Sequence, residues 1–113
     1  MKPGGNASLR VALTTWNGRV SPVLDVARQV EVLDCEEGRI AQRRFASLPG
    51  TEPHLQAEAL QALQAQVLIC GAVSRPLAAL LASVGMQVIP FTAGETGAVL
   101  AAWVAGTLPN PDM

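Results

Sequence analysis

Positive charge is scarce in this chain and is not gathered anywhere. Eight lysines and arginines stand against nine acidic residues in 113, which leaves a formal net charge of -1. Lys2 is the sole lysine, and Arg43-Arg44 is the sole basic doublet. Non-specific nucleic-acid binding depends on a basic patch that releases counterions, and base stacking needs aromatic side chains, which make up only 4% of the sequence. We therefore predict no nucleic-acid partner.

Long apolar runs and paired cysteines are missing as well. Residues 1–8 lack the apolar core of a signal peptide, and glycine, proline or charge interrupts every apolar stretch before it could span a bilayer. We expect a cytoplasmic protein with no membrane partner. The two cysteines, Cys35 and Cys70, lie far apart and form no Cys-x-x-Cys or zinc spacing. Neither a disulfide nor a zinc site is expected.

The length and the apolar content of 50% are typical of one globular domain with one core. We predict a flexible leader over residues 1–8, the domain over residues 9–108 and a short tail over residues 109–113. Alternating apolar residues predict strands near residues 9–14, 30–34 and 39–45. The last two form a hairpin, because Gly38 can take the positive φ of a tight turn.

Helical and strand patterns alternate in the second half of the chain. A helix is expected to begin at Pro53, and a second one at Ser74, which is a suitable N-cap. The third is predicted to begin in a capping box, Thr92-x-x-Glu95, and to end at Gly106. Strands are predicted at residues 67–70 and 87–91. The expected inward faces of the helices are Leu55, Ala59, Leu60, Leu63 and Val67; then Leu77, Leu80, Leu81 and Val84; then Val99, Leu100, Trp103 and Val104.

This order of elements predicts an α/β fold with a five-stranded mixed sheet and helices on both faces. It resembles a small ribonuclease-H-like or doubly wound sheet. Right-handed crossovers make the first, fourth and fifth strands parallel. The loops at residues 14–22, 70–74 and 92–95 then emerge at one edge of the sheet, where α/β proteins bind ligands.

These loops carry groups suited to an anion. Arg19 and Ser21 offer a guanidinium and a hydroxyl. Gly71, Ala72 and Ser74 place backbone N–H donors at a helix N-terminus, where the helix dipole attracts negative charge, and Thr92 and Gly94 are predicted to do the same at the next helix. Each group also has a plain structural interpretation, as a polar turn or as a helix cap.

Several motifs recur in the order and spacing of a known family. Gly18-Arg19-Val20-Ser21-Pro22, Asp25-Val26-Ala27 and Val67-Leu68-Ile69-Cys70-Gly71-Ala72 resemble the dinitrogenase iron–molybdenum cofactor biosynthesis family, as does the closing pattern of Gly94-x-x-Gly97, Trp103 and Gly106. This domain is shared by NifX, NafY and the C-terminal part of NifB. The resemblance implies a ribonuclease-H-like fold that carries an iron–sulfur or iron–molybdenum cluster without catalysis, with cofactor-assembly proteins as partners in nitrogen fixation.

The chain departs from that family at one position. Many relatives have Ser-Pro-His-Phe-Gly where this chain has Ser21-Pro22-Val23-Leu24-Asp25, and valine cannot ligate a metal. Cys70 is then the main candidate metal ligand, because a thiolate suits soft iron sites and a cluster brings its own sulfides. The alternative is that Cys70 is a small buried apolar residue. His54, the only histidine, is expected on the surface, and it contacts a metal only if the loop before it folds over the strand ends.

Two functions remain open at this point. The first is a carrier for a metal cluster or its precursor, with a pocket shaped by Arg19, Ser21, Cys70 and the turn at Gly71. The second is a regulatory or interaction module that has lost cluster binding. An enzyme is less favoured, because the first strand carries no carboxylate for a two-metal nuclease site and Ser21 has no histidine in its loop to serve as a base.

Overall fold

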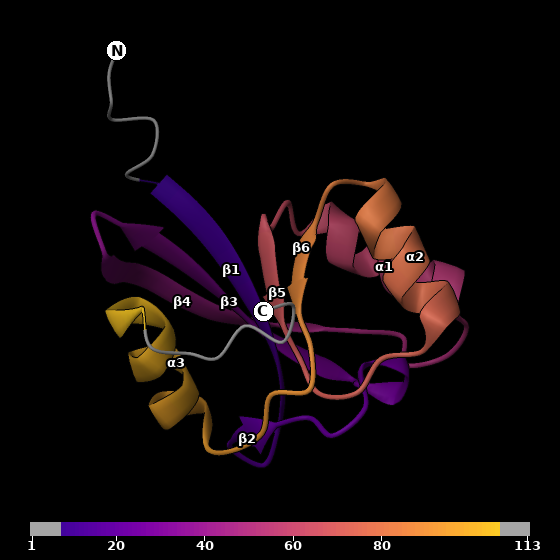
Figure 1. Ribbon diagram of the computed structural model, residues 1–113, viewed down its shortest axis with the longest axis horizontal. Coiled ribbons are helices and arrows are strands. Elements are labelled where there is room, and N and C mark those ends of the chain that lie inside the picture. The colour runs from indigo at the N-terminus through magenta and orange to yellow at the C-terminus, as the bar shows by residue number, and fades with distance from the viewer. Residues whose placement is uncertain (1–7, 107–113) are drawn as a thin grey trace.

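A computed structural model describes residues 8–106 of the chain. These residues form one mixed α/β domain around a six-stranded sheet (Figure 1). The strands are β1 (Ser8–Trp16), β2 (Arg19–Val20), β3 (Gln29–Glu36), β4 (Arg39–Ser47), β5 (Val67–Ile69) and β6 (Gln87–Ile89). The helices are α1 (Pro53–Ala62), α2 (Arg75–Ser83) and α3 (Thr96–Ala105), with a single 3-10 turn at Leu24–Val26.

The strand order is β4-β3-β1-β5-β6, with the short β2 paired to β1 outside this path. Strand β1 is central because its apolar residues can be covered on both faces. Val11, for example, pairs with Leu33 of antiparallel β3 and with Val67 of parallel β5. Strand β6 is parallel to β5, so the predicted parallel strands and the predicted edge hairpin of β3 and β4 are both confirmed.

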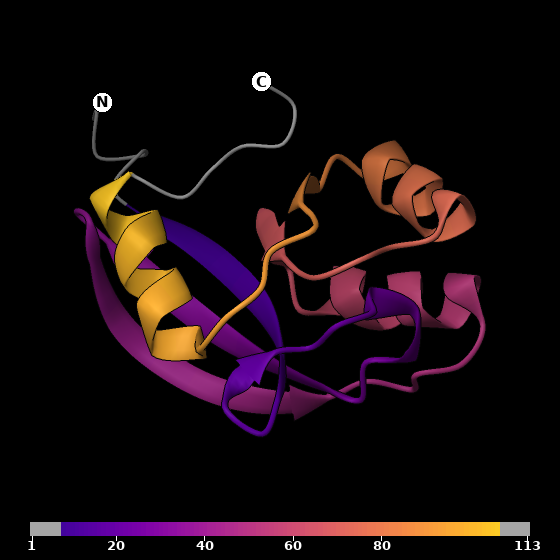
Figure 2. The ribbon, with the colours of Figure 1, turned by 60° about the horizontal axis from the view of Figure 1, so that its bottom comes forward.

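Side-chain alternation along the strands divides the core between the two faces of the sheet. Ala12 and Leu68 face one cluster, which α1 and α2 close with Leu60, Leu77 and Leu81. Val11, Leu13 and Ile69 face the other, which α3 closes with Val99 and Leu100. Figures 1 and 2 show this division: α1 and α2 lie side by side, while α3 lies apart from them across β1, β3 and β4. The helices cover both faces, as predicted.

The predicted number of five strands was wrong, because the chain also forms β2. Asn17 and Gly18 both have a positive φ, of 53° and 76°. Such a pair turns an antiparallel hairpin tightly, and Trp16 accordingly pairs with Arg19. Asn-Gly is a strong hairpin signal, whereas our interpretation of the sequence treated the whole segment as a loop. The ribonuclease-H-like assignment stays a prediction.

Two helix predictions also need correction. Helix α3 begins at Thr96, and Glu95 is its N-cap residue without a side-chain bond, so the Thr92-x-x-Glu95 capping box was wrong. The Thr92 hydroxyl instead donates to the Ile89 carbonyl at 3.4 Å. In α1 the inward face holds Gln56, Ala57 and Leu60, while Leu55 is 41% exposed.

The ends of the predicted domain are only partly visible. Strand β1 begins at Ser8, one residue earlier than predicted. The rest of the predicted leader and the predicted tail at residues 109–113 lie outside the described residues. Within residues 8–106, no helix is long and apolar enough to cross a membrane.

Candidate functional site

The three predicted loops do meet at one edge of the sheet. The Ala72 N–H donates to the Pro22 carbonyl at 2.8 Å, and the Phe91 N–H donates to the Gly71 carbonyl at 2.9 Å. The Val20 N–H likewise donates to the Gly94 carbonyl at 2.9 Å. Backbone hydrogen bonds therefore continue the sheet beyond its strands, as the topology predicted.

Gly71 is required by the close approach of two of these loops. A Cβ atom at this position would lie 2.3 Å from the Pro22 carbonyl oxygen and 2.5 Å from the Ser21 carbonyl oxygen. Both contacts are far inside van der Waals distance, and both partners are backbone atoms that cannot turn aside. A residue larger than glycine would separate the β5–α2 turn from the segment after β2.

The N-terminus of α2 already holds a carboxylate of the chain itself. The Ser74 N–H donates to Asp25 Oδ1 at 2.8 Å, and the Ser74 hydroxyl donates to Asp25 Oδ2. Ser74 Oγ also accepts from the Leu77 N–H at 3.4 Å, so its predicted N-cap role is confirmed. Asp25 thus takes the place that a bound anion could have had at this helix terminus.

The other residues predicted to bind an anion also form hydrogen bonds within the chain. Thr92 donates its N–H to the Cys70 carbonyl at 2.9 Å, and Gly94 offers its carbonyl to Val20. Together with Gly71, Ala72 and Ser74, these residues tie the loops to one another. Direct contact between any of them and a ligand stays a prediction.

Cys70 is fully buried and faces the core under α1 and α2. Burial, reinforced by the negative charge of Asp25, raises the pKa of its thiol to about 12. Burial and the charge of Asp34 likewise raise the pKa of the Cys35 thiol. Both cysteines are therefore protonated thiols near neutral pH, and metal ligation needs the thiolate. Among residues 8–106, no three histidine, cysteine or acidic side chains are grouped to hold a metal ion.

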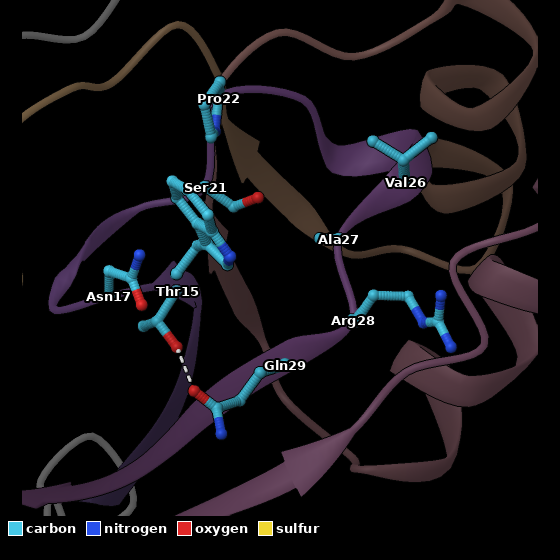
Figure 3. A pocket seen from close by; sticks show the side chains of 9 residues that line it. Thr15, Asn17, Ser21, Pro22, Val26, Ala27, Arg28 and Gln29 are labelled. Atoms are coloured by element: carbon cyan, nitrogen blue, oxygen red, sulfur yellow. Dashed lines mark hydrogen bonds between the residues drawn. The ribbon is translucent and has the colours of Figure 1, made fainter.

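A pocket of about 520 Å³ lies beside the β1–β2 hairpin. It is lined by Thr15, Trp16, Asn17, Ser21, Pro22, Val26, Ala27, Arg28 and Gln29. Figure 3 shows Asn17 and Ser21 on the hairpin side, with Thr15 donating to the neighbouring Gln29 Oε1 at 3.1 Å. Val26 and Arg28 lie on the other side, and the Arg28 side chain extends away from Ser21. The lining contains one arginine and no carboxylate, so its charge is positive. Of the residues predicted for the site, only Ser21 lines this pocket.

The wall of this pocket is held by a residue that the sequence analysis missed. Gln56 of α1 is fully buried, and its Nε2 donates to the carbonyls of Leu24 and Ala27, both at 2.8 Å. Its Oε1 accepts from the Gly50 N–H at 2.9 Å. Gln56 thus uses one side chain to fix two loops. A polar residue in the middle of an apolar helix face was the available signal.

The remaining candidates lie around this centre. Arg19 is exposed on β2 and pairs through its backbone with Glu95. Val23 is 39% exposed and bridges to Ala72. The side chain of His54 on α1 is 58% exposed, so its predicted position on the surface is confirmed.

Comparisons with known proteins agree with this architecture. The crystal structure of PH0822 is similar with a TM-score of 0.83 at 19% identity, over 90% of this chain and 94% of that chain. The apo form of the orange protein from Desulfovibrio gigas gives 0.74 at 20% identity, over 90% and 92%. A Thermotoga protein provisionally named NifB gives 0.70 at 21% identity, over 93% and 95%. At these identities, the similarity to the three structures shows that this chain has the same fold.

Sequence comparison gives the family. No curated protein sequence matches the chain. The family described as dinitrogenase iron-molybdenum cofactor, however, matches residues 7–106, which include the β1–β2 hairpin, the Gly71 turn and all of α3. With its motifs in order and its loops joined at one edge of the sheet, this chain belongs to the dinitrogenase iron–molybdenum cofactor family.

Proposed function

We propose that this protein is a non-catalytic carrier whose cargo is a preformed, anionic iron–sulfur or iron–molybdenum type cluster, or a precursor of one. Its family is that of nitrogenase cofactor biosynthesis. The cargo is held in the pocket beside the β1–β2 hairpin and passes to or from cofactor-assembly proteins. The observation that carries this proposal is the positive lining of a pocket without any carboxylate.

The charges around the pocket favour an anion. The guanidinium groups of Arg28 and Arg19 are exposed and form no ion pair with any residue between 8 and 106. Asp25 and Glu31, the two acids nearest to Arg28 in the sequence, are bonded to Ser74 and Arg43. A cation that forms no ion pair keeps its attraction for an added anion, and a partly enclosed site weakens that attraction less than open water does.

Hydrogen bonds, rather than thiolates, are the proposed means of holding the cargo. Ser21 lines the pocket, and its hydroxyl has no hydrogen-bond partner within the described part of the chain. The amide groups of Asn17 and Gln29 add N–H donors for sulfide or oxygen atoms of a cluster. Arg28 and Arg19 add charge-assisted donors.

The other predicted site residues have supporting roles in this proposal. Gly71, Ala72, Ser74, Thr92 and Gly94 fix the loops around the pocket through the hydrogen bonds given above. Ligation by Cys70 would require the segment after β2 to open and the thiol to lose its proton. The pKa of about 12 opposes that step, so we keep Cys70 outside the proposed contacts.

The alternative is an interaction module that no longer binds a cluster. Val23 in place of the family histidine favours it, as does the burial of both cysteines. The two functions differ in one measurable property, which is binding of an anionic cluster to the isolated protein.

Anaerobic titration with a synthetic, thiolate-ligated four-iron four-sulfur cluster tests the proposal. We expect visible absorption to co-elute with the protein in gel filtration. Arg28→Gln should weaken binding about tenfold, the worth of one charge-assisted hydrogen bond. Arg39→Gln, at the far end of the β3–β4 hairpin, is the matched control and should bind as the wild type does. Cys70→Ala should also keep binding.

Two results would contradict the proposal. A wild-type protein that stays colourless, both in this titration and after incubation with iron and sulfide, leaves the interaction module as the function. If Cys70→Ala alone abolishes the absorption, the cluster is held by the thiolate and the hydrogen-bonded mode of holding is wrong.

A further inference from the structure

Helix α3 carries no charged side chain along its whole length, although it lies on the outside of the sheet. Among its residues, Val99 and Leu100 are buried. Its exposed face consists of small or apolar residues, which are Gly97, Ala98, Ala101, Val104 and Ala105. A helix that is apolar all round is normally covered on every side, and residues 8–106 leave this face open.

A groove of about 500 Å³ lies between this face and the β3–β4 hairpin. It is lined by Gly38, Arg39, Ile40 and Arg43 of the hairpin and by Gly97, Leu100, Ala101, Val104 and Ala105 of the helix. Arg43 is paired with the buried Glu31 at 2.8 Å. Arg39 is exposed and forms no ion pair with any residue between 8 and 106, and the nearest acids in sequence, Glu36 and Glu37, do not line the groove. The groove is therefore apolar with one unpaired cation.

An acid and an arginine lie at opposite ends of α3. The β3–β4 turn, which leads into Arg39, lies beside the C-terminal end of the helix (Figures 1 and 2). Glu95 directly precedes the N-terminal end, is exposed and makes no side-chain cap bond. Its backbone bridges to Arg19, but Glu95 forms no ion pair with Arg19 or with any other residue of the described part. Ten helical residues, or about 15 Å, separate the two ends.

The exposed face of α3 is complementary to a second copy of itself. A twofold axis through Ala101 sets two such helices antiparallel, so that all five exposed residues meet one another. Gly97 then faces Ala105 of the other copy, Val104 faces Ala98, and Ala101 faces its own counterpart. The small residues allow the two helices to approach closely, and the largest side chain meets a small one. The same axis brings Glu95 of each copy to the end of the helix where Arg39 of the other copy lies.

We propose that this protein forms a twofold dimer in which the α3 helices pack antiparallel, with Glu95 of each copy beside Arg39 of the other. Burial of the apolar face drives the association, and the two ion pairs select the antiparallel direction. Parallel helices would instead bring each Arg39 against its counterpart. The contact is one short helix wide, so we expect a reversible dimer with a Kd of about 10–100 μM.

Sedimentation equilibrium of the full chain, from about 2 to about 500 μM, measures the dimer. We expect the wild type to change from monomer to dimer over this range. Ala101→Glu places a charge at the centre of the face and should weaken dimerisation by at least about tenfold. Ala79→Glu, at an exposed alanine on α2, is the matched control and should dimerise as the wild type does.

Exchange of the two charges tests the arrangement. Glu95→Arg alone and Arg39→Glu alone should each dimerise about tenfold more weakly, because like charges meet at both contacts. An equimolar mixture of the two variants should form a heterodimer, since each contact then joins an arginine with a glutamate. Within one copy the two positions are farther apart than the Debye length of about 10 Å at 0.1 M salt, so the recovery reports contact between copies. Arg44→Glu changes the same strand on the face of α1 and α2, and its mixture with Glu95→Arg should not recover.

Three results would overturn the proposal. The first is a wild type that stays monomeric over the whole range. The second is a dimer that Ala101→Glu does not weaken, because it forms through another surface. The third is a mixture of Glu95→Arg and Arg39→Glu that associates no better than either variant alone. Equal Tm values of Ala101→Glu and the wild type at about 2 μM, where both are monomers, exclude misfolding as the cause of weaker dimerisation. If the two Tm values differ, the charge exchange decides, since it alters only exposed side chains.

Discussion

Replacing Gln56 with leucine should loosen the whole pocket wall, because one buried amide serves three backbone groups. Leucine has a similar volume, so the change removes hydrogen bonds and leaves little cavity. The Leu24 carbonyl keeps a partner, since it also accepts from the Ala27 N–H at 3.1 Å. The Ala27 carbonyl and the Gly50 N–H lose the partners described above. An orphaned buried group costs about 1–3 kcal/mol, and Gly50 is only half-buried and loses less, so we expect a loss of about 2–4 kcal/mol in the free energy of unfolding.

Urea denaturation followed by tryptophan fluorescence measures this loss. A decrease of about 3 kcal/mol should also lower Tm by roughly 12 °C, since 1 kcal/mol corresponds to about 4 °C in a domain of this size. Gln61→Leu is the matched control, because Gln61 is an exposed glutamine on the same helix. It should change stability by less than about 0.5 kcal/mol. If Gln56→Leu is as stable as Gln61→Leu, the loops at residues 24–27 and 50 do not depend on this side chain and the reasoning fails.

Three further substitutions or treatments test other parts of the structure. Gly71→Ala should lower the free energy of unfolding by about 2 kcal/mol or more, while Gly97→Ala, where a Cβ meets nothing within 4 Å, should be neutral or stabilising in urea denaturation. Thr14→Val should raise stability by about 1 kcal/mol, because the Thr14 hydroxyl is buried with no hydrogen-bond partner in the described residues; a loss of stability would show that the hydroxyl does have one. The raised pKa of Cys70 means that the native state holds its proton when the unfolded state has lost it. The free energy of unfolding of the wild type should therefore fall as the pH rises from about 9 to about 12, and that of Cys70→Ala should fall less. If both proteins lose stability with the same slope in this window, the raised pKa of Cys70 is wrong.

Much of the fold follows from local patterns and a few rules of chain topology. Alternation in β1, the Glu37-Gly38 turn and the capping of α2 by Ser74 depend on residues close in sequence, and each was predicted. The shared edge of the three loops was predictable too, because right-handed crossovers leave little choice once the strands are parallel. Asn17-Gly18 was a local signal as well, but we interpreted this segment as a loop and therefore did not predict β2.

The pocket itself was beyond local reasoning. Its wall depends on Gln56 reaching back to residues about 30 positions earlier in the chain, and no periodic pattern encodes such a reach. The predicted anion donors illustrate the same limit. Ser74 was correctly expected to cap α2, but only the folded chain reveals that Asp25 occupies the helix terminus from 49 residues away.

Strand β4 has a consequence for the protein at high concentration. It forms one edge of the sheet, its nine residues are largely exposed, and such an edge can template the pairing of further chains. It carries three arginines and no acidic residue; Arg43 pairs with Glu31 of β3, while Arg39 and Arg44 are exposed. Two β4 strands that met edge to edge would therefore bring like charges together, which opposes pairing. The arginines of β4 thus oppose aggregation of the protein through this edge of the sheet.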